Sequence, residues 1–71
     1  MKQFTERDKE MICFIQQFQY EKGYSPTVRE ISRGLYISST NTYRRLYKLV
    51  EMGYLKITPN TPRSIVINIA I

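Results

Sequence analysis

The sequence has few of the residues that build metal centres, disulfides or nucleophilic active sites. Of its 71 residues, one is cysteine and none is histidine or tryptophan. The single thiol, Cys13, excludes an internal disulfide, and without histidine it has no partner for a zinc site or a Cys/His nucleophile. We therefore expect a cytoplasmic protein with no metal and no cofactor.

Long apolar runs are also missing. Residues 1–8 lack the apolar segment of a signal peptide, and no run approaches the roughly 18 apolar residues of a membrane span. The chain has no glycine-rich phosphate loop and no convincing acid–base pair, because helix capping and surface charge explain Glu30 and Glu51. The sequence thus predicts neither a membrane protein nor an enzyme.

Acidic residues become scarce in the later part of the chain. Residues 1–28 carry four basic and four acidic side chains, whereas residues 29–71 carry seven basic and two acidic ones. The whole net charge of +5 therefore lies after residue 28. A one-sided basic surface favours a nucleic-acid partner, because neutralising phosphates drives affinity for DNA. A solvated basic face is the alternative, since many small proteins are mildly basic.

Helix signals occupy the first half of the chain. Apolar residues at helical spacing predict a helix over about residues 5–22, which ends at Gly23. Thr27 and Glu30 form a capping box, a threonine followed three residues later by a glutamate, which predicts a short second helix over about 28–35. A connector that contains a proline separates the two helices.

A third helix and a hairpin follow. The Tyr36-Ile37 turn leads into a helix over about 39–52, and two β-prone runs around a proline-rich tip predict a hairpin over about 54–68. This order predicts a mainly α fold with a small β-hairpin, a three-helix winged helix-turn-helix domain that spans residues 1–71. A core of this size supplies only about 3–5 kcal/mol of net stability.

The third helix is apolar on one side and polar on the other. At about 100° per residue, Leu46, Leu49 and Val50 share the core side, with Thr42 and Tyr43 beside them. The opposite face carries amide and basic side chains, namely Asn41, Arg44 and Lys48, with Arg45 at its edge. Such a helix fits the major groove of DNA. The alternative is that the basic side chains only make an exposed helix face soluble.

Position along the third helix separates expected base readers from expected phosphate contacts. In helix-turn-helix docking, the first turns of the recognition helix reach base edges and later positions reach phosphates. We therefore expect Asn41 to read adenine and Arg44 to read guanine, while Arg45 and Lys48 contact phosphates. The residues expected to face the groove floor are Ser39, Thr40 and Asn41. Ser38, with the exposed amides beside it, is a further phosphate site.

The hairpin tip and the second helix offer further contacts. Asn60, Thr61 and Arg63 form a polar tip that two prolines stiffen, which suits a wing lying along the DNA backbone or entering the minor groove. An ordinary polar loop is the alternative. Arg29, in the first turn of the second helix, is placed either for a phosphate contact or for a surface ion pair with Glu30 or Glu51.

Four strings of residues are similar to the N-terminal DNA-binding domain of the LexA repressor family. They are Phe4-Thr5-Glu6-Arg7, Gly-Tyr-Ser-Pro-Thr-Val-Arg-Glu-Ile at 23–31, Leu46-x-x-Leu49-x-x-x-Gly53-Tyr54-Leu55, and Pro-Asn-Thr-Pro-Arg-Ser-Ile at 59–65. The similarity covers about residues 4–67. It implies a winged helix-turn-helix that binds operator DNA through its third helix. By position, it implies base or backbone contacts from Ser38, Ser39, Thr40, Asn41, Arg44 and Lys48.

The turn before the third helix departs from the family pattern. The family usually has a glycine after the leucine of this turn, where this chain has Tyr36, and the turn is one residue shorter. We expect Gly34 to supply the backbone freedom instead. The shorter turn leaves open a shift of Ser38–Asn41 by one residue.

The end of the chain bears on oligomerisation. Family repressors carry a C-terminal self-cleaving peptidase domain that also dimerises, whereas this sequence stops at Ile71, so we expect no self-cleavage. Residues 65–71 are almost wholly apolar, and an unpaired apolar strand edge invites pairing with another chain. The sequence thus predicts a possible homodimer through this tail. The alternative is a wing strand followed by a packed terminus.

Together these features favour a DNA-binding regulator. The leading interpretation is a sequence-specific, double-stranded DNA-binding transcriptional regulator, a repressor of bacterial or phage origin that inserts helix 39–52 into the major groove. The alternative is a winged-helix protein–protein interaction module without sequence-specific DNA binding.

Overall fold

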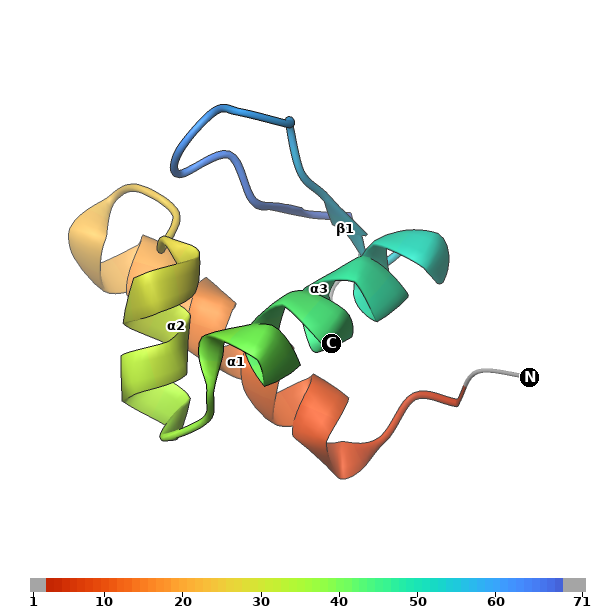
Figure 1. Cartoon of the computed structure of the whole chain (residues 1–71). Helices are drawn as coiled ribbons and strands as arrows, with labels where there is room; N and C mark the ends of the chain where they lie inside the picture. Colours follow the sequence, from red (N-terminus) through yellow and green to blue (C-terminus); the bar gives the residue numbers. More distant parts are fainter. Residues whose placement is uncertain (1–2, 69–71) are drawn as a thin grey trace.

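Three helices and a two-stranded hairpin follow one another in the computed structural model, which describes residues 3–68 (Figure 1). The elements are α1 (Glu6–Lys22), α2 (Val28–Leu35), α3 (Ser39–Glu51), β1 (Leu55–Lys56) and β2 (Val66–Ile67). The strands are antiparallel, with Leu55 opposite Ile67. The hairpin loop extends from the end of α3 back towards the connector between α1 and α2 (Figure 1). The predicted fold class, a winged helix-turn-helix, is confirmed.

Side-chain caps fix where the helices begin. At α1, the Thr5 hydroxyl accepts a hydrogen bond from the Asp8 amide at 3.2 Å, and the Asp8 carboxylate accepts one from the Thr5 amide at 2.9 Å. At α2, Thr27 and Glu30 make the same reciprocal pair at 3.2 and 2.8 Å. The Ser38 hydroxyl caps α3. Each cap satisfies backbone donors that have no partner inside the helix.

The turn between α2 and α3 contains a tyrosine in the left-handed region. Tyr36 has φ 57° and ψ 44°. Gly34 lies inside α2, so the expectation that Gly34 supplies the backbone freedom is wrong. A Cβ at Gly34 would lie 2.2 Å from the Phe14 ring, so this glycine instead permits the close approach of α1 and α2. Ser38 is the residue that caps α3, so the helix begins at Ser39 despite the short turn.

Replacing Tyr36 with glycine should stabilise the domain. The Tyr36 side chain is 94% exposed, so its loss removes little packing, while an L-residue in the left-handed region costs roughly 1–2 kcal/mol. Because glycine also frees the unfolded chain, we expect a net gain of about 0.5–1 kcal/mol in the free energy of unfolding, measured by urea titration. Tyr20→Gly, at an exposed site inside α1, is the control and should lose about 0.5 kcal/mol, because glycine is a poorer helix former than tyrosine. A comparable loss at Tyr36 would contradict the account.

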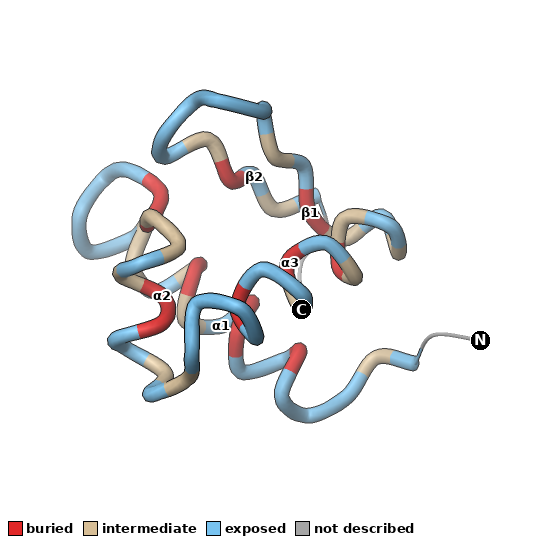
Figure 2. The backbone as a smooth tube through the Cα atoms, in the orientation of Figure 1, coloured by how far each residue is buried: buried red, intermediate tan, exposed pale blue. Residues whose placement is uncertain are grey.

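The core forms where the three helices and the hairpin face one another, as the buried segments in Figure 2 show. Its buried apolar side chains are Met11, Ile12, Ile15, Ile31, Leu46, Leu49, Leu55 and Ile65. The apolar side of α3 therefore packs inward, and its polar side is left to solvent.

Within residues 3–68, no helix combines the length and the apolar content needed to cross a lipid bilayer.

The hairpin has shorter strands than the β-prone runs suggest. Only two residues pair on each side, because Asn60 and Arg63 take left-handed backbone angles, φ 58° and 56°, and two prolines lack amide donors. Beyond the strands, the Ser64 hydroxyl bridges the Thr58 amide and carbonyl at 3.1 and 3.0 Å. A side chain thus replaces strand pairing in holding the long loop together.

Candidate nucleic-acid interface

The first two turns of α3 leave the predicted base-reading side chains in solvent. The exposed residues of this segment include Ser38, Ser39, Thr40, Asn41 and Arg44. In the part of the chain that the structure describes, no carboxylate forms an ion pair with Arg44. Arg45 and Lys48, farther along the helix, are half-buried. The residues predicted to contact DNA from α3 therefore lie together on its outer side.

Two tyrosines occupy the side of α3 that faces the hairpin loop. Tyr43 is 47% exposed, although its helical position suggested the core side. Its ring stacks on that of Tyr47, with centroids 6.1 Å apart. The two stacked rings are both partly exposed, and both line the depression beside the hairpin loop. This edge of α3 is therefore aromatic, whereas the opposite edge is basic.

A buried hydroxyl pair fixes how α3 crosses α2. Ser32 and Thr42 are almost fully buried, and their hydroxyl oxygens lie 2.8 Å apart. Each hydroxyl also lies within hydrogen-bonding distance of a helix carbonyl, that of Val28 for Ser32 and that of Ser38 for Thr42, both at 2.9 Å. Buried polar groups that are satisfied in this way specify one arrangement of the packed helices. The sequence reasoning did not single out Ser32, and it assigned Thr42 only to the core side.

Lys48 is engaged with the start of α1. Its ammonium donates to the Asp8 carboxylate at 2.6 Å, and Asp8 is only 1% exposed. The same carboxylate caps α1 through the Thr5 amide. Burial raises the pKa of Asp8, but the hydrogen bonds from Lys48 and Thr5 outweigh it, so the pKa lies below its ordinary value. The pair connects α1 directly to the basic edge of α3.

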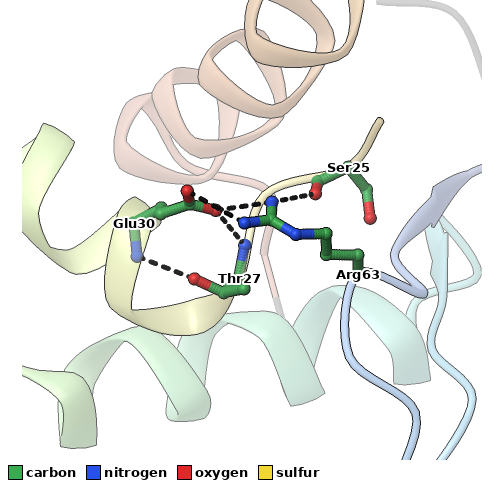
Figure 3. Close-up of polar contacts among 4 residues, drawn as sticks. All are labelled: Ser25, Thr27, Glu30 and Arg63. Carbon is green, nitrogen blue, oxygen red and sulfur yellow. Dashed lines mark hydrogen bonds and ion pairs between the residues drawn. The ribbon is translucent and has the colours of Figure 1, made fainter. Parts of the chain in front are cut away.

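The Arg63 side chain contacts three residues of the protein, and two of them, Ser25 and Glu30, are drawn in Figure 3. Its guanidinium donates to both carboxylate oxygens of Glu30, at 2.9 and 3.3 Å, and to the Ser25 carbonyl at 3.1 Å. It also lies over the Tyr24 ring, 4.4 Å from the centroid. Arg63, which was predicted to contact DNA from the hairpin tip, thus also forms a latch between the hairpin and the start of α2. Glu30 pairs with Arg63.

The two engaged carboxylates make stability sensitive to acid. The Thr27 amide, followed by Arg63, lowers the pKa of Glu30, and the pKa of Asp8 is also lowered. The unfolded chain therefore takes up protons first as the pH falls, and stability is lost from about pH 4, the ordinary carboxyl value, down through the folded-state values. We expect the urea midpoint to be level above about pH 5 and to fall below pH 4. Asp8→Asn should flatten this fall, and an unchanged profile would contradict the role of Asp8.

Two depressions flank α3. The hairpin depression, about 560 Å³, lies between α2, α3 and the hairpin loop, and its lining includes Arg29, Tyr43, Tyr47, Asn60, Thr61 and Arg63. The α1 depression, about 430 Å³, lies between the start of α1 and α3, and is lined by Thr5, Arg7, Asp8, Asn41, Arg44, Arg45 and Lys48. All the predicted contacts outside Ser38, Ser39 and Thr40 therefore border one or the other depression.

Comparison with known proteins identifies relatives of this sequence. It matches the family described as LexA DNA binding domain over residues 1–64. It is 40% identical over 62 residues to the LexA repressor of Carboxydothermus hydrogenoformans, covering 86% of this chain and 30% of that protein. It is 38% identical over 66 residues to the LexA repressors of Bacillus mycoides and Bacillus cytotoxicus, covering 92% of this chain and 32% of each. The chain thus spans about 30% of the length of these curated relatives.

Proposed function

This chain belongs to the LexA DNA-binding domain family, and on that premise we propose that it is a sequence-specific regulator of transcription that binds double-stranded DNA. In this proposal it acts as a repressor in the bacterial cytoplasm and inserts α3 into the major groove. The observation that carries the proposal is the exposed polar face at the start of α3. The family is described as a DNA-binding domain, which is consistent with a DNA-binding role for this face. That description names no catalytic activity.

Within this proposal, the side chains of α3 divide by position. Asn41 and Arg44 read base edges, because amide and guanidinium groups match adenine and guanine in the major groove. Ser39 and Thr40 lie beside them at the groove floor. The Ser38 hydroxyl accepts from the Asn41 amide at 3.1 Å, which leaves its proton free to donate to a phosphate. Specificity thus rests on the first two turns of α3.

The hairpin depression supplies backbone contacts on one flank of α3. Arg29 lines it from α2, and Asn60 and Thr61 line it from the exposed tip of the loop. A helix in the major groove has a phosphate backbone on each side. We place the backbone nearest the hairpin across this depression, where these three side chains reach it.

The variant Arg63→Ala distinguishes two roles of Arg63, a direct contact with a DNA phosphate and an internal contact that holds the hairpin against α2. A phosphate contact predicts that Arg63→Ala lowers the salt dependence of binding by about one unit of slope. Because its guanidinium is held by Glu30 and Ser25, we expect an unchanged slope and a weaker affinity for all duplexes. Glu30→Gln, which weakens the same latch without removing a positive charge, should weaken affinity in the same way. A slope reduced by about one for Arg63→Ala alone would return Arg63 to phosphate binding.

The rival function is docking on a protein. A winged helix used in that way needs an exposed apolar patch. Among the described residues, the large exposed hydrophobic side chains are Val66 and five tyrosines, Tyr20, Tyr24, Tyr36, Tyr43 and Tyr47. Tyrosine carries a polar hydroxyl, so these side chains favour a wet, polar partner over an apolar one.

Salt dependence of DNA binding tests the proposal against this rival. Fluorescence anisotropy with a duplex of unrelated sequence measures the association constant at several salt concentrations. We expect its logarithm to fall linearly with the logarithm of salt concentration, by about 0.9 per phosphate contacted. An absence of binding to any duplex at about 50 mM salt would contradict the proposed function.

The expected homodimer stays a proposal. In the described part of the tail, Ile65 is buried, Ile67 is half-buried against the core, and Val66 is exposed. Residues 69–71, on which the rest of that expectation depends, lie outside the described residues. Truncation after Asn68 with light scattering tests it. A fall from dimer to monomer mass supports the tail interface, and an unchanged mass ends it.

A further inference from the structure

We propose that the α1 depression binds a phosphate of the DNA backbone, and that Arg7 and Arg45 are the side chains that hold it. The inference rests on the proposed function and adds a contact that α3 and the hairpin do not supply. Arg7 is the residue it newly assigns. It lies in the first turn of α1, is exposed, and lines the depression together with Arg45 of α3.

The charge of the depression favours a phosphate. Four basic side chains from two helices line it, Arg7, Arg44, Arg45 and Lys48, against one carboxylate, Asp8. That carboxylate is buried and accepts hydrogen bonds from Lys48 and the Thr5 amide. Its charge therefore offsets that of Lys48, and the positive charge of the three arginines is not neutralised within the depression. Within residues 3–68, none of these three forms an ion pair. A guanidinium group binds two phosphate oxygens at once, which suits a depression lined by arginines from two different helices.

The position of the depression agrees with the docking of α3. At about 100° per residue, Arg45 and Tyr47 lie on opposite edges of the exposed face, with Arg44 near its middle. The Tyr47 edge borders the hairpin depression and the Arg45 edge borders the α1 depression. If Arg44 points at the bases, the two backbones that bound the groove pass over these two edges. The backbone away from the hairpin therefore meets the start of α1.

This placement gives Lys48 a positioning role. Its ammonium is held at 2.6 Å from the Asp8 carboxylate, and Asp8 belongs to the same helix turn as Arg7. The ion pair thus fixes the first turn of α1 against α3, and with it the separation of Arg7 from Arg45. Lys48 orients the site, while Arg7 and Arg45 contact the phosphate.

Anisotropy titrations of Arg7→Ala give the first test. We expect the salt slope to fall by about 0.9 and affinity at about 100 mM salt to fall five- to tenfold, equally for a selected site and for an unrelated duplex. Lys22→Ala removes the same charge at the other end of α1, outside both depressions, and should leave the slope unchanged. Arg7→Lys should restore most of the slope. Equal slopes for Arg7→Ala and Lys22→Ala would overturn the proposal.

Neutral methylphosphonate substitutions, placed one at a time along a bound duplex, give the second test. For the wild-type protein, we expect substitution at one phosphate on the backbone away from the hairpin to weaken binding. For Arg7→Ala, the same substitution should have no further effect. Identical substitution patterns for both proteins would overturn the contact while leaving the proposed function intact, since a failed function would show as no duplex binding by the wild type.

A titration with inorganic phosphate distinguishes a site for the phosphates of the DNA backbone from a site for a free anion. We expect only weak shifts of the Arg7 and Arg45 side-chain NMR signals at phosphate concentrations below about 10 mM, because a single exposed phosphate contact is weak alone. Saturating shifts at micromolar phosphate, together with DNA binding that is unaffected by Arg7→Ala, would mark a small-anion site and overturn the assignment to DNA.

Discussion

Asp8→Ala is expected to lower the free energy of unfolding by about 3 kcal/mol, since removing one partner of a buried pair typically costs 3–5 kcal/mol. The substitution leaves the half-buried Lys48 ammonium without its carboxylate and the Thr5 amide without its cap. Such a loss approaches the whole stability of a domain of this size, about 3–5 kcal/mol. Urea titration with a stabilising osmolyte keeps the folded baseline measurable.

Three variants show where this loss comes from. Asp8→Asn retains an oxygen for the Thr5 amide and should lose less than Asp8→Ala. Adding Lys48→Met to Asp8→Asn removes the unpaired charge, so stability should partly return. Glu10→Ala, an exposed acidic site on the same helix, should change stability by no more than about 0.5 kcal/mol. A loss for Asp8→Ala no larger than that for Glu10→Ala would contradict the structural role of the pair.

Arg44→Ala is expected to cost about 1–3 kcal/mol in binding to a preferred duplex, and to relax the preference at one base pair. Arg44 is exposed near the middle of the outer face of α3 and pairs with no described carboxylate. A guanidinium paired with guanine discriminates against the other bases by this amount. Anisotropy titrations on a preferred site and on its single-base variants measure both effects.

The pattern of loss decides the role of Arg44. Lys22→Ala, which removes a charge outside both depressions, should alter neither affinity nor preference beyond a small uniform change. If Arg44→Ala weakens binding equally for every sequence, Arg44 belongs with the phosphate contacts. If it has no effect at all, Arg44 lies outside the interface, and the orientation proposed for α3 is wrong.

Local sequence signals predicted the elements and the outer face of α3. The capping threonines and Ser38 act on neighbours three residues away, so their pattern is readable from the chain alone. The same is true of Asn41 and Arg44, because helical periodicity separates them from Leu46 and Leu49. These signals depend only on spacing, and tertiary packing preserves it.

Contacts between distant segments were not predictable in this way. Asp8 lies 40 residues from Lys48, and Glu30 lies 33 from Arg63, so neither pairing has a local signature. In both cases a carboxylate that caps a helix also binds a basic side chain. The capping role of each carboxylate could be predicted from the sequence, whereas its distant basic partner could not.

The position of the left-handed residue in the turn between α2 and α3 was also not predicted correctly from the sequence. Gly34 was expected to relieve the turn because glycine usually occupies left-handed positions. The left-handed residue is Tyr36, and Gly34 instead makes room for the Phe14 ring. Which of two nearby positions carries the strain depends on how closely α2 packs on α1, and spacing does not contain that information.

Selection of bound sites from random duplex DNA, at fixed salt, tests the central claim most directly. If α3 reads bases from its first two turns, repeated selection by the wild-type protein should enrich a short motif, and selection by Arg44→Ala should lose preference at one position of it. Retention of DNA with no enriched motif, or of no DNA at all, would contradict sequence-specific recognition by this domain.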